Sequence, residues 1–310
     1  MIVEEKYEKI SVLGNQKKRK FGFVYLIQNR ATKEFFVLKE LKKTSKNQHL
    51  VNQLRLESEF SFDHPTLPKT IDLIENESKI QLIRSFSKGT PLNEYWYTIK
   101  KKNQIPTLEK ILTALVQPLN ELKSKSIVHC DFKPSNLIVE EIEDELKINI
   151  IDFGLAIDLT KKHNRNTLFP LGYAAPELIL NDINSIDHTT DLFSLGIIIY
   201  QLFTRELPLR HPNPSIMTNL QITHPIQSHR KIPKQLFHII EKICKKHCFN
   251  LPPNRYSKTN ITLFLNEINQ QRYQNLEEII VELNKIPKYL NTRKIDLIKF
   301  FSKPNIKRNQ

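Results

Sequence analysis

The feature that most constrains the fold is a change in the spacing of apolar residues close to residue 89. Before it, the chain has short runs rich in β-branched and aromatic residues, as in residues 21–28 and 34–41, and such runs are typical of β-strands. After it, apolar residues recur every three or four positions, as in amphipathic helices. Strands followed by helices predict an α+β fold. We expect a small β-rich lobe over about residues 1–86 and a larger helical lobe over about residues 87–268.

The same patterns predict the individual elements. Thr107 is expected to cap a helix. Pro118 inside that run counts against an unbroken helix, because proline lacks a backbone donor and can kink a helix. The other expected helices lie at residues 47–62, from Thr189 or Thr190 to near Phe203, around residues 233–248 and around residues 258–268. Further strands are expected at residues 70–74 and 79–83, and residues 269–310 are expected to form a basic helical extension.

The chain is strongly basic. Lysine and arginine number 47 against 33 aspartate and glutamate residues, which gives a formal charge of +14. An excess of this kind favours anionic partners such as nucleotides, acidic proteins, nucleic acid or a membrane surface, and it does not choose among them. The basic extension is either a contact for an anionic partner or membrane surface, or a solvated segment.

No segment is expected to cross a membrane. The longest apolar-rich run, residues 192–203, is shorter than the roughly 20 residues that a bilayer requires. The first ten residues include acidic side chains where a secretory signal has basic ones, and the three cysteines are too few for a disulfide framework. We therefore expect reduced thiols in a cytoplasmic protein, or in one that reaches the host-cell cytosol if it is a delivered bacterial effector. We also expect the protein to be a monomer.

Glycine is scarce in this chain. It has six glycines among 310 residues, well below the usual share of about 7%. A chain so poor in glycine is expected to keep one mainly where a side chain would clash or where φ must be positive. The six are Gly14, Gly22, Gly89, Gly154, Gly172 and Gly196.

The densest group of chemically active residues is the segment HCDFKPSN at residues 129–136, followed by DFG at residues 152–154. Phosphoryl transfer needs positioning and charge neutralisation more than covalent chemistry. A carboxylate such as Asp152 can hold Mg²⁺ against a triphosphate, and an amide oxygen such as that of Asn136 can bind a second metal ion. Asp131 can accept the proton of an attacking hydroxyl, and Lys133 can stabilise the transferred group.

These segments resemble the eukaryotic-type protein kinase family, whose signature motifs recur here in the family's order over about residues 7–268. The segment HCDFKPSN is similar to the catalytic loop, and DFG is similar to the metal-binding motif. The other matching segments are Leu13-Gly14 with Phe21-Gly22-Phe23-Val24, Val37-Leu38-Lys39, Gly172-Tyr173, Ala175-Pro176-Glu177 and the helix start at Asp191. The resemblance implies a bilobal kinase fold with residues 1–268 as the kinase domain.

The resemblance also implies a role for each matched residue. Asp131 corresponds to the catalytic base and Lys133 to the residue that stabilises the phosphoryl group. Asn136 and Asp152 correspond to ligands of Mg²⁺, with Mn²⁺ as a possible substitute, and Lys39 corresponds to the lysine that contacts the α- and β-phosphates of ATP. The residues expected to cover the nucleotide are Leu13, Gly14, Gly22 and Val24.

Two ion pairs are implied as well. In the family, the lysine at the position of Lys39 pairs with a glutamate of the first helix. Arg55 occupies the ungapped position for that glutamate, so Glu57 is the expected partner and Glu59 the alternative. Arg255 resembles a late arginine of the family and is expected to pair with Glu177.

Four features depart from the family pattern. The glycine-rich loop lacks its middle glycine and carries residues 17–20 (KKRK), which lie either over the phosphates or in a solvated loop tip. Cys130 replaces the arginine that usually meets an activation-loop phosphate, so activity is expected not to depend on such phosphorylation. Pro170 stands where a threonine usually ties the catalytic residues together, with Thr167 nearby. Arg84 falls at the back of the adenine pocket, where it either restricts the pocket or extends outward.

The resemblance implies a serine/threonine kinase that transfers the γ-phosphate of ATP to a protein hydroxyl with Mg²⁺. Lys133 resembles the lysine of the serine/threonine branch. Two alternatives stay open. One is a pseudokinase or scaffold that binds nucleotide without turnover, and the other is a kinase-fold enzyme that acts on a small-molecule or lipid hydroxyl.

Overall fold

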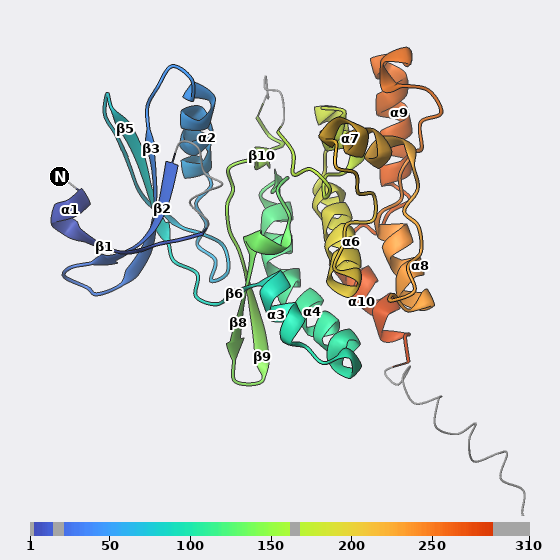
Figure 1. The fold of residues 1–310 in the computed structure, drawn as a ribbon, viewed down its shortest axis with the longest axis horizontal. Coiled ribbons are helices and arrows are strands. Elements are labelled where there is room, and N and C mark those ends of the chain that lie inside the picture. The colour runs from blue at the N-terminus through green and yellow to red at the C-terminus, as the bar shows by residue number, and fades with distance from the viewer. Residues whose placement is uncertain (1–2, 15–21, 162–167, 288–310) are drawn as a thin grey trace, which may run out of the picture.

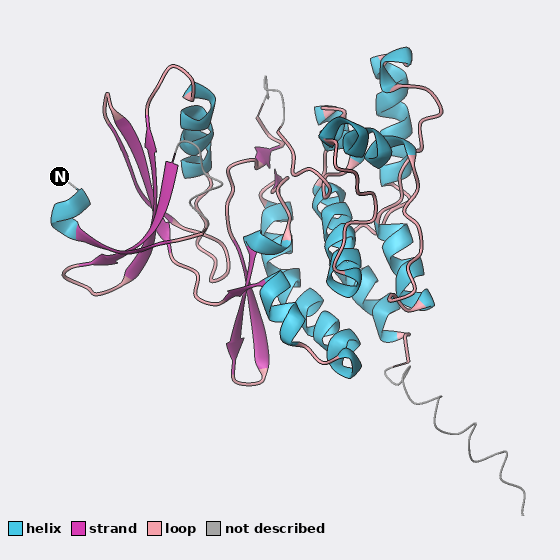
Figure 2. Ribbon diagram, in the orientation of Figure 1, coloured by secondary structure: helices cyan, strands magenta, loops and turns pink. Residues whose placement is uncertain are grey.

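A computed structural model gives the fold of residues 3–14, 22–161 and 168–287. A β-sheet lobe lies at one end of the molecule and a helical lobe at the other (Figure 1, Figure 2). The predicted two-lobed α+β fold is therefore confirmed. Residues 17–20, Thr167 and the basic residues beyond 287, all noted in the sequence, lie outside the described residues.

The small lobe is a five-stranded antiparallel sheet in the order β1-β2-β3-β5-β4, with one long helix packed against it. Each predicted strand is present within a residue or two of its predicted position. The elements are α1 (Val3–Lys6), β1 (Tyr7–Val12), β2 (Gly22–Asn29), β3 (Phe35–Lys42), α2 (Gln48–Glu59), β4 (Thr70–Glu75) and β5 (Lys79–Ser85).

The register of β3 against β5 determines which side chains share a face of this sheet. Val37 lies opposite Arg84, and Lys39 lies opposite Leu82. Side chains two residues apart in a strand point to the same face, so all four residues share one face. Lys39 and Arg84 thus approach the helix α2 from two neighbouring strands.

The large lobe contains most of the helices and a small three-stranded sheet in the order β6-β8-β9. Its helices and strands are β6 (Thr90–Pro91), α3 (Leu92–Thr98), α4 (Gln104–Ser124), β7 (Ile127–Val128), β8 (Leu137–Ile142), β9 (Glu145–Ile150), β10 (Ile157–Asp158), α5 (Pro176–Ile179), α6 (His188–Thr204), α7 (Pro214–Thr223), α8 (Lys234–Ile243), α9 (Lys258–Asn269) and α10 (Leu276–Asn284). The described residues of this lobe also form the short 3₁₀ turns η2 (Lys101–Asn103), η3 (Pro134–Asn136), η4 (Ile183–Ser185) and η5 (Pro253–Arg255).

Gly89 lies where the chain passes from the small lobe to the large one. Its φ is +129°, and a Cβ atom there would lie 2.2 Å from the carbonyl oxygen of Val139. Both the backbone angle and the close approach require glycine. The short pairing of β6 with β8 therefore depends on this one residue.

The helix α6 forms the centre of the large lobe. It is apolar around nearly its whole circumference, as expected of a helix buried on all sides. Gly196 lets α8 come close, since a Cβ atom there would lie 2.5 Å from the sulfur of Cys244. The predicted end of this helix near Phe203 agrees with the structure to within one residue.

Two predicted helix caps are wrong. Asp187 caps α6, because its carboxylate accepts a bond from the backbone of Thr189 while the Thr190 hydroxyl accepts one from the backbone of Asp187. The acid is the stronger acceptor, and the threonine completes a capping box. The helix α4 begins at Gln104 rather than after Thr107, because the turn η2 leads directly into it and already accepts the Gln104 N–H. Pro118 stays within α4, where it is buried.

The extension predicted from residue 269 contributes one described helix, α10. Ile279 and Leu283 are buried in the core of the large lobe. The Asn120 side chain on α4 donates to Glu277 on α10 at 2.9 Å. This helix is therefore packed against the lobe.

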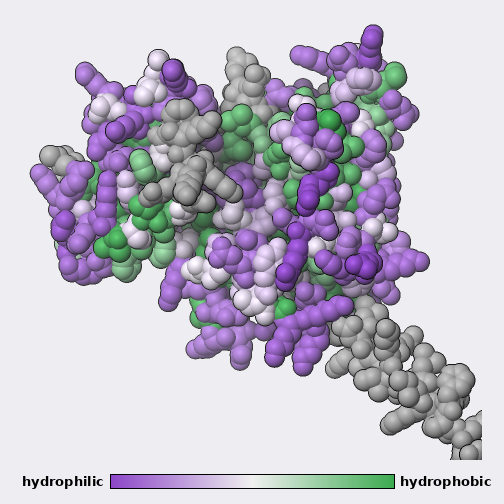
Figure 3. All heavy atoms as spheres, in the orientation of Figure 1, coloured by the Kyte–Doolittle hydropathy of each residue, from purple (hydrophilic) through white to green (hydrophobic). Residues whose placement is uncertain are grey.

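The described part of the chain contains no helix that is both long and apolar enough to cross a bilayer. On the face shown in Figure 3, hydrophilic side chains cover most of the described surface, and hydrophobic ones form smaller patches between them.

Candidate active site

The segment from His129 to Asn136 links β7 to β8. Its backbone is anchored by the Asp191 carboxylate, which accepts N–H bonds from His129 at 2.7 Å and from Cys130 at 2.9 Å. Cys130 has a φ of +59°, a strained conformation that surrounding contacts must maintain. Asp191 was not given this role from the sequence. The available signal was an acid at the start of an otherwise apolar helix.

Three polar side chains of this segment meet. The Lys133 ammonium lies 2.6 Å from Asp131 Oδ2, and the Asn136 amide nitrogen donates to both the backbone oxygen and Oδ2 of Asp131 at 2.9 Å. The turn η3 brings Asn136 back beside Asp131. Burial raises the pKa of Asp131, and the Lys133 charge opposes that rise. A carboxylate with a raised pKa is a better proton acceptor than an exposed one.

Asp152 reaches the same place from the loop after β9. Its φ is +69°, so this carboxylate too is presented by a strained backbone. Lys39 Nζ lies 2.7 Å from Asp152 Oδ1, and the charge of that lysine lowers the pKa of Asp152 well below its usual range. The next residue, Phe153, is buried with its ring 4.6 Å from that of His129. This packing joins the two loops of the site.

Lys39 forms its closest ion pair with Glu57. The Lys39 ammonium lies 2.6 and 2.8 Å from the two carboxylate oxygens of Glu57, whose side chain is 3% exposed. The alternative partner, Glu59, contacts Lys161 instead, and Arg55 pairs with Glu75 on the surface. Although burial opposes the charge of Lys39, the carboxylates of Asp152 and Glu57 raise its pKa.

Residues at the start of β2 lie beside Lys39 at the border of the site, and the end of β1 adjoins them. A cavity of about 260 Å³ is lined by Gly22, Val24, Lys39, Glu57, Asp152 and Gly154, among others. Leu13 is joined to Val24 by a backbone hydrogen bond of 2.7 Å, and Gly14 follows it with a φ of +75°. Gly22 and Val24 thus line this cavity directly, whereas Leu13 and Gly14 lie at the end of β1.

The predicted pairing of Arg255 with Glu177 is wrong. Arg272 takes that place, with its two terminal nitrogens 2.7 and 3.2 Å from the Glu177 carboxylate. Arg255 lies exposed in η5. Arg272 follows α9, and its Nε donates to the backbone oxygen of Lys245 at 2.9 Å, which directs the side chain inward. No local sequence pattern distinguishes Arg272 from other arginines.

The surroundings of Cys130 are apolar. Its side chain belongs to a buried cluster that includes Val128, Ile157, Ala174 and Leu178. The protein kinase family usually has an arginine at this position, where it binds an activation-loop phosphate. In this chain the position is part of a hydrophobic cluster instead.

Pro170 contributes through its backbone. Its carbonyl oxygen accepts bonds from the N–H groups of Tyr173 and Ala174, each at 3.1 Å. Tyr173 is held further by Ser194, whose hydroxyl donates to the Tyr173 backbone oxygen at 3.0 Å. The turn that leads to residues 175–177 is therefore fixed without the hydroxyl of the usual threonine.

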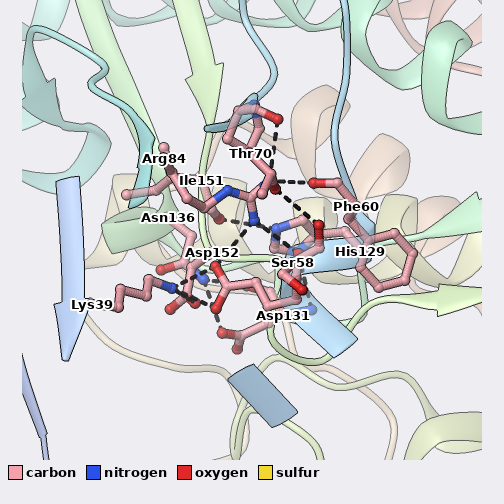
Figure 4. A network of polar contacts seen from close by, with 12 residues as sticks. Lys39, Ser58, Phe60, Thr70, Arg84, His129, Asp131, Asn136, Ile151 and Asp152 are labelled. Carbon is pink, nitrogen blue, oxygen red and sulfur yellow. Dashed lines mark hydrogen bonds and ion pairs between the residues drawn. The ribbon is translucent and has the colours of Figure 1, made fainter. Parts of the chain in front are cut away.

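Arg84 points inward to α2 rather than outward. Its side chain is buried and contacts Glu57 and the backbone oxygen of Pro68. The sequence left both orientations open. Figure 4 shows Lys39, Arg84, Asp131, Asn136 and Asp152 within one network of polar contacts.

Comparisons with known proteins agree with the geometry of the site. Residues 7–274 match the family model for the protein kinase domain. Serine/threonine-protein kinase ATG1b of Arabidopsis thaliana is 34% identical over 150 residues, which cover 47% of this chain and 20% of that protein. The probable serine/threonine-protein kinase CPE1738 of Clostridium perfringens is 26% identical over 299 residues, which cover 93% of this chain and 39% of that protein. The chain thus spans well under half the length of these two curated relatives.

Proposed function

The chain belongs to the protein kinase domain family, and from this premise we propose that it transfers the γ-phosphate of ATP to a serine or threonine hydroxyl of a protein substrate. The similar proteins named above are serine/threonine-protein kinases. The segment 168–177, with its turn fixed through Pro170 and Tyr173, contains the Ala175-Pro176-Glu177 motif, and this motif favours a protein substrate.

The observation that carries the proposal is the convergence of two sets of groups. Lys39, paired with Glu57, lies within 2.7 Å of Asp152, while Lys133 and Asn136 both contact Asp131 across a single turn. Figure 4 shows Lys39, Asp152, Asp131 and Asn136 in one network. Phosphoryl transfer needs a cationic anchor for the phosphates, a metal-binding acid and a base for the hydroxyl. The two sets supply these groups.

The donor atoms also fit a divalent cation. Mg²⁺ prefers carboxylate and amide oxygens, and the Asp152 side chain is 42% exposed. The amide nitrogen of Asn136 makes both bonds to Asp131, which leaves its oxygen as the atom for a cation. Asp152 and Asn136 would hold Mg²⁺, or Mn²⁺ in its place. When bound, the ion supplies neutralisation of phosphate charge.

The remaining residues act on the hydroxyl and on the phosphoryl group. Asp131 accepts the hydroxyl proton, and its buried position favours this because burial raises its pKa. Lys133, now 2.6 Å from Asp131, stabilises the charge on the transferred phosphoryl group. Lys39 contacts the α- and β-phosphates, and Gly22 and Val24 cover the nucleotide together with Leu13 and Gly14.

A second candidate function is a scaffold that binds nucleotide without turnover. The observation that favours it is the contact of Lys39 with Asp152 at 2.7 Å, which occupies the carboxylate proposed to bind metal. For turnover, Lys39 must exchange this contact for the phosphates. The retention of Asp131, Lys133 and Asn136 in mutual contact favours the enzyme.

One experiment separates the two. The purified chain is incubated with γ-labelled ATP and either Mg²⁺ or Mn²⁺, and self-labelling and labelling of generic protein substrates are scored. Transfer to serine or threonine supports the proposal. ATP binding without transfer supports the scaffold, and transfer to small alcohols or lipids alone would show that the substrate class is wrong.

We place the kinase domain at residues 1–268 and a basic extension at 269–310, and we propose a monomeric, cytoplasmic protein. The helix α10 packs into the core of the large lobe, so the first part of the extension is expected to stabilise the domain. The basic residues beyond 287 stay candidates for an anionic partner or membrane surface.

A further inference from the structure

Arg84 is an arginine buried in the centre of the small lobe. It lies on β5 with its side chain 4% exposed. Its Nη1 atom donates to the backbone oxygen and to Oε1 of Glu57, both at 3.2 Å. Its Nη2 atom donates to the backbone oxygens of Phe60 and Pro68 (Figure 4). One guanidinium thus joins β5 to the end of α2 and to the segment that follows α2.

Arg84 and Lys39 share one carboxylate. Glu57 Oε1 lies 2.6 Å from Lys39 Nζ and 3.2 Å from Arg84 Nη1. Lys39 also contacts Asp152, so two cations and two carboxylates form a charge-balanced chain. Burial lowers the pKa of Arg84, but a guanidinium starts from so high a value that it stays charged at neutral pH.

The two cations differ in what they can do next. Lys39 is 20% exposed and borders the cavity, whereas Arg84 is buried and bound to three carbonyl groups as well as the carboxylate. When Lys39 turns toward an anion in the cavity, its attraction to Glu57 weakens. A buried carboxylate left without a partner is costly. Arg84 is placed to prevent that state.

We propose that Arg84 is a positioning residue for phosphoryl transfer: it holds Glu57 and the end of α2 in place while Lys39 exchanges Asp152 for the phosphates of ATP. This inference rests on the proposed function, because it assigns Arg84 to the ATP site of that function. The expected consequence is that Arg84 contributes to ATP affinity although it lies behind Lys39.

The test compares variants by calorimetric ATP binding, steady-state kinetics and amide hydrogen exchange over residues 48–60. Arg84→Met removes the charge and all donors, and it is expected to weaken ATP binding about tenfold, a usual size for coupling between sites. It should also raise KM for ATP more than it lowers kcat, and speed exchange at the end of α2. Arg84→Lys restores the charge and should recover part of the affinity.

A matched control comes from the same helix. Arg55→Met removes an arginine of α2 that pairs on the surface with Glu75 of β4, and it should leave ATP affinity unchanged. In a Glu57→Gln background, Arg84→Met should have little further effect on ATP affinity, since the carboxylate through which Arg84 acts is gone. A purely structural arginine would instead give the same loss in both backgrounds.

The inference is overturned if Arg84→Met lowers thermal stability but binds ATP as tightly as the unchanged chain. Should Arg84→Met fail to fold, Arg84→Gln keeps donors for the carbonyl groups without the charge, and unchanged ATP affinity in that variant overturns the inference equally. If the unchanged chain binds ATP but transfers no phosphate, the proposed function fails, while the binding comparison still decides the role of Arg84.

Discussion

Two buried ion pairs in this protein differ in whether solvent or a ligand can reach them. The Arg272–Glu177 pair in the large lobe is closed to solvent, with the two side chains 1% and 0% exposed, and the Thr190 hydroxyl also donates to Glu177 at 2.9 Å. The Lys39–Glu57 pair is open on one side, because Lys39 is 20% exposed and also contacts Asp152. The closed pair has one arrangement, whereas the open pair can change partners.

The difference teaches where to look for function among buried charges. A buried ion pair whose acid is not shared with a cation at a cavity stabilises the fold, and removing either member leaves the other as an unpaired buried charge. A cation that borders a cavity and is shared between two acids can respond to a ligand. The predictions below test this distinction, beginning with the largest expected effect.

The largest effect is expected when the proposed catalytic base, Asp131, is replaced. Asp131→Asn keeps the shape of the side chain but cannot accept the hydroxyl proton, so kcat should fall by about 10²–10⁴-fold. ATP binding, measured by calorimetry, should persist because Asp131 does not contact Lys39. Unchanged turnover in this variant would refute the assignment of the base.

The open pair should be important for activity rather than folding. Lys39→Met removes a charge that stabilises the phosphates, and activity should fall by about 10²–10³-fold. Glu57 keeps its contact with Arg84, so thermal unfolding should change little. A large loss of stability in Lys39→Met, seen by calorimetry or circular dichroism, would mean that the open pair is structural too.

The closed pair should behave in the opposite way. Arg272→Met leaves the buried Glu177 carboxylate without its cation, which should destabilise the protein by about 3–5 kcal/mol. Chemical denaturation measures this loss. At a temperature where the variant is still folded, its KM for ATP should match that of the unchanged chain. A raised KM there would contradict the separation of the two pairs.

The pH dependence of activity should reflect the burial of Asp131. Burial raises the pKa of Asp131, and Lys133 opposes that rise. Only the deprotonated form accepts a proton, so kcat at saturating ATP should be full above this raised pKa and fall as the pH drops through it. In Lys133→Met the fall should begin at a higher pH. A kcat that stays constant down to the ordinary pKa of an aspartate would contradict this.

The smallest effect is expected from removing phosphate groups. Cys130 lies in an apolar cluster with Ile157 and Leu178, so no cation at this position is available for an activation-loop phosphate. Treatment with a phosphatase, with removal checked by mass spectrometry, should leave turnover unchanged. Loss of turnover would show that another cation binds such a phosphate.

The parts of the site that could be predicted from the sequence are those held by short-range geometry. Asp131, Lys133 and Asn136 lie within six residues, and one 3₁₀ turn brings them together. Four strands of the small lobe, β2, β3, β4 and β5, could be predicted because each satisfies its own local pattern, whereas β1 was not predicted. The caps of α4 and α6 were not, because several polar residues competed at each start and the structure used η2 and Asp187.

The sequence by itself determined the two-lobed fold, the change from strands to helices along the chain and the residues in the catalytic segment, because periodicity and turn chemistry act between neighbours. Only the tertiary structure decided that Glu57 rather than Glu59 meets Lys39, that Arg272 rather than Arg255 meets Glu177, and that Arg84 turns inward. A long charged side chain can reach many places, and a buried acid pairs with whichever cation the packing brings within reach. That choice depends on contacts between segments far apart in the chain, which no local pattern records.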